Sequence, residues 1–305
     1  MNLYGARKRE TGIVTAFFSL PAVVLLLVYI YYSVGYAFFL SFHEWNGIAP
    51  VKDFVGLMNW KELVRDNAFI EAFKHNIYIV VWSLVVQQPI AMALAFMLIR
   101  AGRKSTPLKV IYYLPSLFST ASVGVLFSYI YSPRDGIFTA MASGIATVMQ
   151  GAPVRVTVDM FQVGTSLLSV FSVISWTAIP FYILFYMAAM SGISTDIYEA
   201  AIIDGASLGQ YFFRIMLPSL KFSIQTACTL SIIGSLKYFD LIYIITDGGP
   251  SFSSELMATY MFRQTFRFRQ MGYGSATAGG LFIIVVVFSL LVLFVSNKIL
   301  RENEE

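Results

Sequence analysis

Charged residues are scarce in this chain, in which Asp, Glu, Lys and Arg together make up 12% of 305 residues. A soluble domain carries about twice that share, whereas 57% of this sequence is hydrophobic. We therefore expect most of the chain to lie in lipid rather than around a water-facing core. The net charge of +4 is modest and lies mainly in loops and near the ends of apolar runs, which favours membrane topology over nucleic-acid binding.

Cysteine and histidine are almost missing. The single cysteine, Cys228, lies inside an apolar run, so neither a disulfide framework nor a cysteine-based zinc site can form from this chain alone. The two histidines, His43 and His75, lack a partner at metal-ligand spacing, so we predict no metal site. The phosphate-binding pattern GxxxxGKS/T is also absent. We predict that the chain is not an enzyme and binds no cofactor, so that any ATP-Mg belongs to another polypeptide.

Long apolar runs dominate the sequence, and several reach the ~20 residues that a helix needs to cross the hydrocarbon core. They predict an all-α integral membrane fold with six transmembrane helices, at residues 11–42, 77–99, 110–131, 165–190, 222–246 and 276–296. The first external loop should hold a short helix over residues 60–75. Residues 136–154 carry no charge but are rich in small residues. We interpret them as an external hairpin or an interfacial helix, not as a seventh span.

The expected organisation is a tail (1–10), a transmembrane domain (11–298) with a long internal loop (191–220), and a second tail (299–305). Basic residues set its orientation, because Lys and Arg concentrate on the cytoplasmic side. Three precede the first span, and four lie within residues 100–109. Eleven of the Lys and Arg residues then lie inside and nine outside. This moderate excess predicts that both termini are cytoplasmic.

One segment between two apolar runs, with the sequence EAAIIDGASLGQYFFRIMLP, is predicted to be a folded loop rather than a flexible connection. Ser194 or Asp196 can cap a first short helix. Gly205 can end that helix, because a residue without a Cβ takes the left-handed conformation of a helix end. Ser207 can cap a second short helix, which we expect to run through Phe213.

This segment resembles the EAA loop of permease subunits of ATP-binding-cassette (ABC) importers, in the form EAAxxDGAxxxxxFxxIxLP of the carbohydrate branch with its maltose-type permeases. The matching positions are Glu199, Ala200, Ala201, Asp204, Gly205, Ala206, Phe212, Ile215, Leu217 and Pro218. The resemblance implies a type I ABC importer permease fold and a coupling helix that docks into a cleft of a separate ATPase subunit. The residues that it assigns to coupling are Glu199, Ala200, Ala201, Asp204, Gly205, Ala206, Ser207, Leu208, Gln210 and Phe212. The alternative is an ordinary amphipathic connector between two membrane helices.

The same resemblance implies the partners. They are a second, similar permease, two ATP-binding-cassette subunits, an extracytoplasmic solute-binding protein and a carbohydrate substrate, in a prokaryotic inner or plasma membrane. The DGA triplet and a GGP turn at residues 248–250 favour sugars over amino acids, peptides or phosphate. An ion-coupled secondary transporter remains an alternative, although it usually has carboxylates near the midplane and an inverted repeat. A membrane scaffold or enzyme accessory is another.

A substrate path is predicted from polar residues inside the spans, namely Ser175, Trp176, Thr229, Ser231, Lys237 and Asp240. Trp176 is the preferred candidate, because a buried indole N–H needs a partner. Lys237 and Asp240 lie three apart, so on one continuous helix they can pair. Lys237 follows Lys221 by about 24 Å of helix, in the outer third of the membrane, where the pair either snorkels or lines the outer mouth. Ser and Thr in membrane helices also serve close packing.

Overall fold

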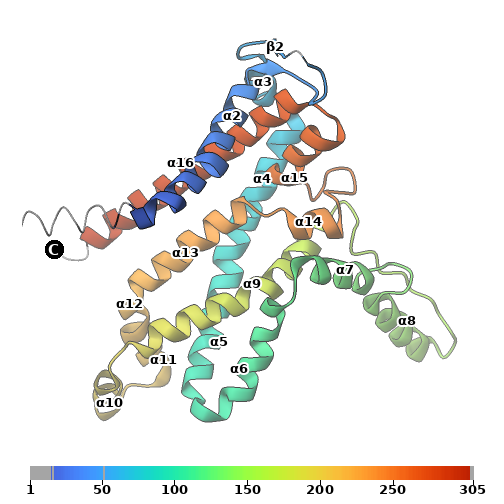
Figure 1. Ribbon diagram of the computed structural model, residues 1–305. Helices are drawn as coiled ribbons and strands as arrows, with labels where there is room; N and C mark the ends of the chain where they lie inside the picture. Colours follow the sequence, from blue (N-terminus) through green and yellow to red (C-terminus); the bar gives the residue numbers. More distant parts are fainter. Residues whose placement is uncertain (1–14, 16, 51, 303–305) are drawn as a thin grey trace, which may run out of the picture. The chain divides into compact units, whose positions relative to one another are not determined.

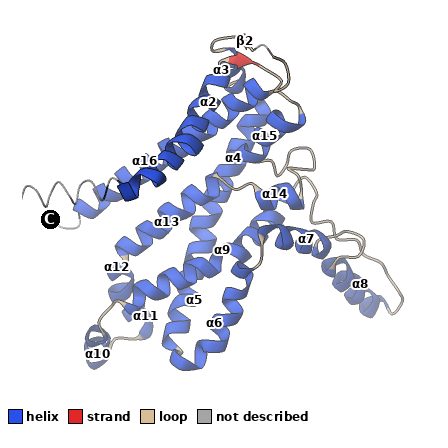
Figure 2. Cartoon of the chain, in the orientation of Figure 1, coloured by secondary structure: helices blue, strands red, loops and turns tan. Residues whose placement is uncertain are grey.

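The computed structural model describes residues 15, 17–50 and 52–302 (Figure 1). This described part is mainly helical, and its sheet is an antiparallel hairpin of β1 (His43–Glu44) and β2 (Asp53–Phe54) (Figure 2). Contacts divide the chain into two compact units. The first combines Met1–Arg65 with Met261–Gly280, and the second combines Asp66–Tyr260 with Leu281–Glu305.

The first unit contains the hairpin and the helices around it. These helices are the π-helical turn Leu27–Tyr31, α2 (Tyr32–Leu40), α3 (Met58–Leu63), the π-helical turn Arg263–Arg267 and the start of α16 (Met271–Glu302). Asn59 on α3 is buried and donates its amide to the carbonyls of Ser41 and His43, at 2.9 and 3.0 Å. Gly272 at the start of α16 approaches the same His43 carbonyl so closely that a Cβ would not fit. Glycine is therefore required there.

The second unit is a bundle built on one long helix. This helix consists of α4 (Asn67–Trp82), the π-helical turn Ser83–Gln87 and α5 (Gln88–Arg100). Two helices pack against it, α9 (Ser166–Ser191) along α5 and α13 (Lys221–Leu236) along α4. A further pair is formed by α14 (Asp240–Ile245) and α7 (Thr120–Ile130). The remaining elements are the 3-10 turns Gly102–Ser105 and Leu114–Leu117, the π-helical turn Tyr211–Met216, α6 (Thr106–Tyr113), α8 (Ile137–Gln150), α10 (Thr195–Ile203), α11 (Leu208–Gln210), α12 (Leu217–Ser219) and α15 (Met257–Phe262).

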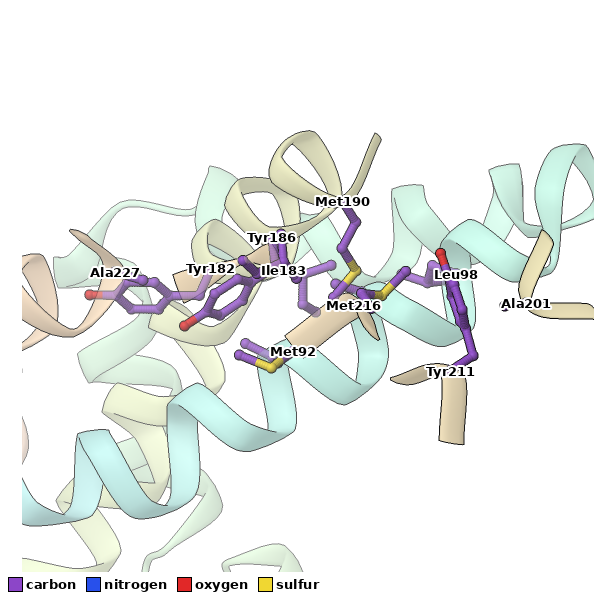
Figure 3. Close-up of a cluster of buried hydrophobic side chains, with 13 residues drawn as sticks. Met92, Leu98, Tyr182, Ile183, Tyr186, Met190, Ala201, Tyr211, Met216 and Ala227 are labelled. Carbon is purple, nitrogen blue, oxygen red and sulfur yellow. The ribbon is translucent and has the colours of Figure 1, made fainter. Parts of the chain in front are cut away.

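Two apolar cores hold the second unit together. One joins α5 and α9 to the 191–220 loop around the fully buried Tyr186 (Figure 3). The other joins α7, α9 and α14 around the fully buried Ile174 and Ile242. The loop is thus packed into a core shared with two of the long apolar helices.

The described residues contain five helices that are long and apolar enough to cross a membrane. They are Phe17–Leu40, Asn67–Arg100, Ser166–Ser191, Lys221–Ile245 and Met271–Phe294. A sixth span is present if the bent pair Thr106–Leu117 and Thr120–Ile130 counts as one. The six predicted spans are therefore all represented, and α8, with 14 residues, is a short apolar helix as expected of 136–154 and not a seventh span. The predicted tail at 1–10 lies outside the described residues, as do the last three residues (303–305) of the predicted tail at 299–305.

The third predicted span is not a continuous helix. Its two halves meet at an angle of 96°. Pro115 cannot donate a backbone hydrogen bond within the first half, and Phe118 then takes an extended conformation with ψ 145°. Ser119 starts the second half as its N-cap, accepting from the N–H of Ser122 at 3.2 Å. The span predicted over 110–131 therefore consists of two helices, because these two signals divide it.

The short helix expected over 60–75 is also wrong. α3 ends at Leu63, and Asp66 caps a new helix by accepting from the N–H of Ala68 at 2.9 Å. That helix continues without interruption to Arg100, so the second apolar helix begins ten residues earlier than residue 77. Charged residues in its first turns hid this boundary, since Glu71 and Lys74 form an exposed ion pair there.

Candidate functional site

The 191–220 loop begins with α10, whose two ends are set by local hydrogen bonds. Ser194, rather than Asp196, is the N-cap, and its hydroxyl accepts from the N–H of Asp196 at 3.2 Å. Gly205 follows the helix with φ +76°. Its N–H donates to the Ile202 carbonyl, and the N–H of Ala206 donates to the Ala201 carbonyl, both at 2.9 Å. This is a Schellman motif, and it confirms the predicted stop at Gly205.

The second helix of the loop starts with a reciprocal cap. The N–H of Gln210 donates to the Ser207 hydroxyl at 3.3 Å, and the N–H of Ser207 donates to the Gln210 side-chain carbonyl at 2.7 Å. This capping box satisfies two otherwise free N–H groups. The helix runs past the predicted end at Phe213, through a π-helical turn to Ser219. Pro218 does not end it, because proline is tolerated in the first turn of α12.

One face of the loop is buried in the core of the bundle. Ala201, Tyr211 and Met216 are only 5–6% exposed and pack with residues of α5 and α9, including Leu98 and Met190 (Figure 3). Burial raises the pKa of the Tyr211 phenol. The aromatic rings of the loop add two further pairs, Tyr198 with Tyr211 at 5.0 Å and Phe96 with Phe212 at 4.8 Å between centroids. The loop is therefore attached to the helices that it connects.

The opposite face is exposed and mixes acidic with large apolar side chains. Ile203 is 84% exposed, Phe213 66% and Ile202 54%. Of the residues assigned to coupling, those that are exposed are Glu199, Ala200, Asp204, Gly205, Ser207, Leu208 and Gln210. Ala206 and Phe212 are half-buried, and Ala201 is buried. Exposed apolar side chains gathered on one folded loop are typical of a protein-binding surface.

The loop also contains the sequence GASLG, residues 205–209, which matches the GxSxG pattern of hydrolase nucleophiles. That chemistry needs the serine on a sharp turn between a strand and a helix. Here Ser207 follows α10, and its hydroxyl is used as a helix cap. The pattern therefore serves helix capping.

Among the predicted substrate-path residues, Ser175 on α9 is hydrogen-bonded to two side chains of the long helix. Its hydroxyl accepts from the indole N–H of Trp82 at 2.8 Å and from the Gln87 amide at 3.2 Å. It also donates to the Phe171 carbonyl within its own helix at 2.7 Å. Trp176 is 38% exposed, and its ring faces Phe127 at 5.3 Å. The expectation of a buried indole at Trp176 is wrong, and the indole hydrogen-bonded to Ser175 is that of Trp82.

The other two hydroxyl candidates, Thr229 and Ser231, both lie on α13. Ser231 is buried at 3% exposure. Thr229 is half-buried and donates to the Gln225 carbonyl of its own helix at 2.8 Å. This bond is compatible with a packing role.

The expected pairing of Lys237 with Asp240 does not occur. The helix breaks between them, since α13 ends at Leu236 and α14 starts at Asp240. Both side chains are exposed, and within the described residues they form no ion pair with each other. Asn76, fully buried on α4, donates to the carbonyls of Ser235 and Leu236 at 3.2 and 3.3 Å. It thereby satisfies carbonyls that the break leaves without helical partners.

Sequence reasoning missed four polar residues of the long helix, Asn76, Trp82, Gln87 and Gln88. The two glutamines are buried, and the Gln88 carbonyl accepts from the Tyr186 hydroxyl at 2.7 Å. Two adjacent amides inside an apolar run are a signal in themselves, because polar groups are costly in the membrane and usually have partners there.

Comparison with known proteins assigns the family. Residues 89–301 match the family described as binding-protein-dependent transport system inner membrane component. The chain belongs to this family. The matched range includes the whole 191–220 loop and all the predicted site residues, whereas α4 with Asn76 and Trp82 lies before it.

Several relatives align along nearly the whole length of this chain. "Probable ABC transporter permease protein YurN" of Bacillus subtilis is 32% identical over 92% of this chain and 95% of its own. "Arabinooligosaccharides transport system permease protein AraP" of the same organism is 28% identical over 94% and 89%. A chain in the crystal structure of a bacterial alginate ABC transporter with an alginate pentasaccharide-bound periplasmic protein is 23% identical, with a TM-score of 0.80 over 98% of both chains. The fold is that of a type I ABC importer permease, as expected.

Proposed function

We propose that this chain is a permease subunit of an ATP-driven, binding-protein-dependent carbohydrate importer in a prokaryotic cell membrane. Its family supports the importer, and the names of several relatives support the carbohydrate. Besides AraP, these include "Multiple sugar-binding transport system permease protein MsmF" of Streptococcus mutans and "Trehalose/maltose transport system permease protein MalF" of Thermococcus litoralis. The DGA triplet and the GGP turn agree with them.

The observation that carries the proposal is the two-faced loop at 191–220. One face, with Tyr211 and Met216, is packed into the bundle core, and the other presents Ile203 and Leu208 to a partner. A loop built in this way can transmit a displacement to the transmembrane helices, because its own helices are capped and it shares an apolar core with α5 and α9. The partner that we assign to it is an ABC ATPase, since the chain has no phosphate-binding loop of its own.

The mechanism follows from this attachment. Closure of two ATPase subunits on ATP-Mg moves the helix that starts at Ser207, and Tyr211 passes this motion to α5 and α9. The bundle, paired with a second similar permease, then alternates between inward and outward access. An extracytoplasmic binding protein delivers the sugar. In this arrangement the chain supplies half of the pathway, and Ser175, Trp176, Thr229, Ser231, Lys237 and Asp240 are its candidate path residues.

The mechanism requires the loop and both termini to lie in the cytoplasm. The four cations within residues 100–109 and those before the first span support this orientation. A Gln210→Cys variant, made with Cys228 replaced by serine, tests it with a membrane-impermeant maleimide. We expect modification only from the cytosolic side of sealed vesicles. Modification from the exterior of intact cells contradicts the mechanism.

Uptake by the purified complex tests the function itself. Protein purified from its native membrane should retain the second permease and the ATPase, and its proteoliposomes should accumulate sugar only with ATP inside and binding protein outside. Transport by the chain alone, driven by a proton or sodium gradient, contradicts the importer. ATP-dependent uptake of an amino acid or peptide, with no uptake from a panel of sugars, would support the assignment as an importer. It would contradict the assignment of a carbohydrate substrate.

A further inference from the structure

The helix α8 has a hydroxyl-bearing face. Thr139, Ser143 and Thr147 are spaced by four residues, so they lie above one another on the same side of the helix. After α8, Gly151 turns the chain with φ +67°, and the chain returns along the helix in an extended conformation. Figure 1 shows α8 beyond the end of α7, with the returning segment beside it. The segment over residues 153–159 is called the return strand.

The return strand is hydrogen-bonded to the hydroxyls of α8 in regular order. The N–H groups of Val154, Val156 and Val158 donate to the hydroxyl oxygens of Thr147, Ser143 and Thr139, at 3.1, 2.9 and 3.1 Å. The same hydroxyls lie 3.1–3.4 Å from the carbonyl oxygens of the same valines. Four helical residues rise about 6.0 Å and two extended residues about 6.6 Å. Because these repeats nearly match, all three pairs form.

The opposite face of α8 is an exposed apolar stripe. Successive residues of a helix are rotated by about 100° around its axis. The centre of the apolar stripe therefore lies roughly 180° around the axis of α8 from the centre of the three hydroxyl-bearing residues. Its side chains are Ile137, Phe138, Met141, Ile145, Val148 and Met149, and Val148 and Met149 are 84% and 81% exposed. One side of the helix is therefore hydrogen-bonded to the return strand. The opposite side is exposed, apart from a ring contact between Phe138 and Tyr131 at 5.5 Å between centroids.

Lipid is the occupant that fits this stripe. The chain belongs to a family of membrane components, and α8 lies between α7 and α9, where two apolar helices end. No charged residue interrupts the sequence from Ile137 to Val154. Helix–helix contacts in membranes favour small side chains, whereas this stripe is made of large ones. A second permease is therefore a poorer match than acyl chains.

The return strand fixes how deep α8 can lie. Its outward edge carries Arg155 and Thr157, whose backbone groups make no hydrogen bond within the described residues. Unpaired backbone groups are excluded from hydrocarbon, and the Arg155 side chain is 68% exposed. With 14 residues, α8 spans about 21 Å, too short to cross a core of about 30 Å. The return strand thus belongs on the water side.

We propose that α8 is an interfacial anchor. Its apolar stripe lies in the acyl region of one leaflet, and the return strand covers its hydroxyl face toward water. This is the arrangement of an amphipathic helix lying in the plane of the membrane, with the polar face supplied by a strand in place of charged side chains. The anchor holds the connection between α7 and α9 at the bilayer surface.

Spin-label accessibility tests the anchor in the full-length chain, reconstituted in liposomes of neutral phospholipid. Single cysteines are placed at Val148 on the stripe and at Thr157 on the return strand, with Cys228 replaced by serine. Oxygen partitions into lipid and a neutral nickel chelate into water. We expect the ratio of oxygen to nickel accessibility to be several-fold higher at position 148 than at position 157. Met141→Cys is a second stripe position if the label at 148 disturbs folding.

Each other outcome overturns the proposal. High nickel accessibility at positions 148 and 141 places the stripe in water. Low accessibility to both reagents at these positions means that protein covers the stripe, and a second permease is then its partner. High oxygen accessibility at position 157 as well places the whole hairpin in hydrocarbon.

Discussion

The hydroxyl of Tyr186 on α9 donates a 2.7 Å hydrogen bond to the side-chain carbonyl of Gln88 on α5, and both residues lie in the interior of the bundle. This bond joins the two helices that pack most extensively in the second unit and that hold the 191–220 loop. Tyr186 is fully buried and Gln88 is 4% exposed. Water therefore cannot replace a lost partner at this position.

Tyr186→Phe should destabilise the protein, because it leaves the Gln88 carbonyl without this donor. A buried acceptor that loses its partner costs about 1–3 kcal/mol. We expect a lower unfolding temperature in detergent, measured by intrinsic fluorescence. Tyr129→Phe is the matched control, since Tyr129 is 74% exposed. Equal unfolding temperatures for Tyr186→Phe and the parent protein would show that the bond contributes nothing.

Gly205→Ala should loosen the end of α10. The residue has φ +76°, and a Cβ in the left-handed conformation costs about 1–2 kcal/mol. Hydrogen exchange at the N–H groups of residues 205 and 206 should accelerate, because they make the two closing bonds. Gly209→Ala is the control, since no atom lies within 4 Å of the Cβ position and its φ is not positive. Exchange that is the same in both variants contradicts the role of the left-handed conformation.

Glu199→Lys should uncouple the importer while leaving membrane insertion intact. The side chain is exposed on α10, so reversing its charge changes the proposed ATPase surface without affecting the core. The measurement is ATPase co-purification and sugar-stimulated ATP hydrolysis in the assembled complex, both of which should fall at least several-fold. Asp196→Lys, at another exposed carboxylate of α10 outside the coupling set, should have a smaller effect. Normal coupling in the Glu199 variant would show that this residue is not part of the ATPase-binding surface.

Thr147→Val should release the end of the return strand next to Gly151. Valine keeps the shape of threonine but removes the acceptor for the Val154 N–H, at a cost of about 1 kcal/mol. We expect faster cleavage within residues 152–156 during limited proteolysis, with the rest of the chain unaffected. Thr157→Val, an exposed position on the return strand, serves as the control. An unchanged cleavage rate would mean that the hydroxyl ladder does not hold the strand.

Much of this architecture could be predicted from the sequence, where the signals are local. Length and apolarity identified the spans, and side-chain chemistry at Ser194, Gly205 and Ser207 identified the caps of the loop. These features depend on neighbours within a few residues. The return strand on α8 could not be predicted in this way, because the hydroxyls at 139, 143 and 147 match the extended chain only once the chain has turned at Gly151.

The interior network was harder to predict for a different reason. Trp176 and Ser175 are neighbours in sequence, but helix geometry turns them about 100° apart, and only Ser175 faces the long helix. Which face of α9 is buried depends on α5 and α4, not on α9 itself. The same holds for Lys237 and Asp240, whose spacing suits one continuous helix. The break after Leu236 is accompanied by hydrogen bonds from Asn76, about 160 residues earlier in the chain.

The π-helical turn Ser83–Gln87 changes the direction in which side chains point along the longest helix of the bundle. Such a turn accommodates one residue more than an α-helical turn, so the side chains before and after it are offset by about 100° around a common axis. Gln87 is the last residue of this turn and Gln88 follows it directly, so the direction of both side chains toward α9 depends on the turn. Deleting one residue within 83–87 would turn the segment into a regular α-helix and leave both amides pointing in their present direction. Converting the segment to α-helix without a deletion would instead rotate both amides away from Ser175 and Tyr186.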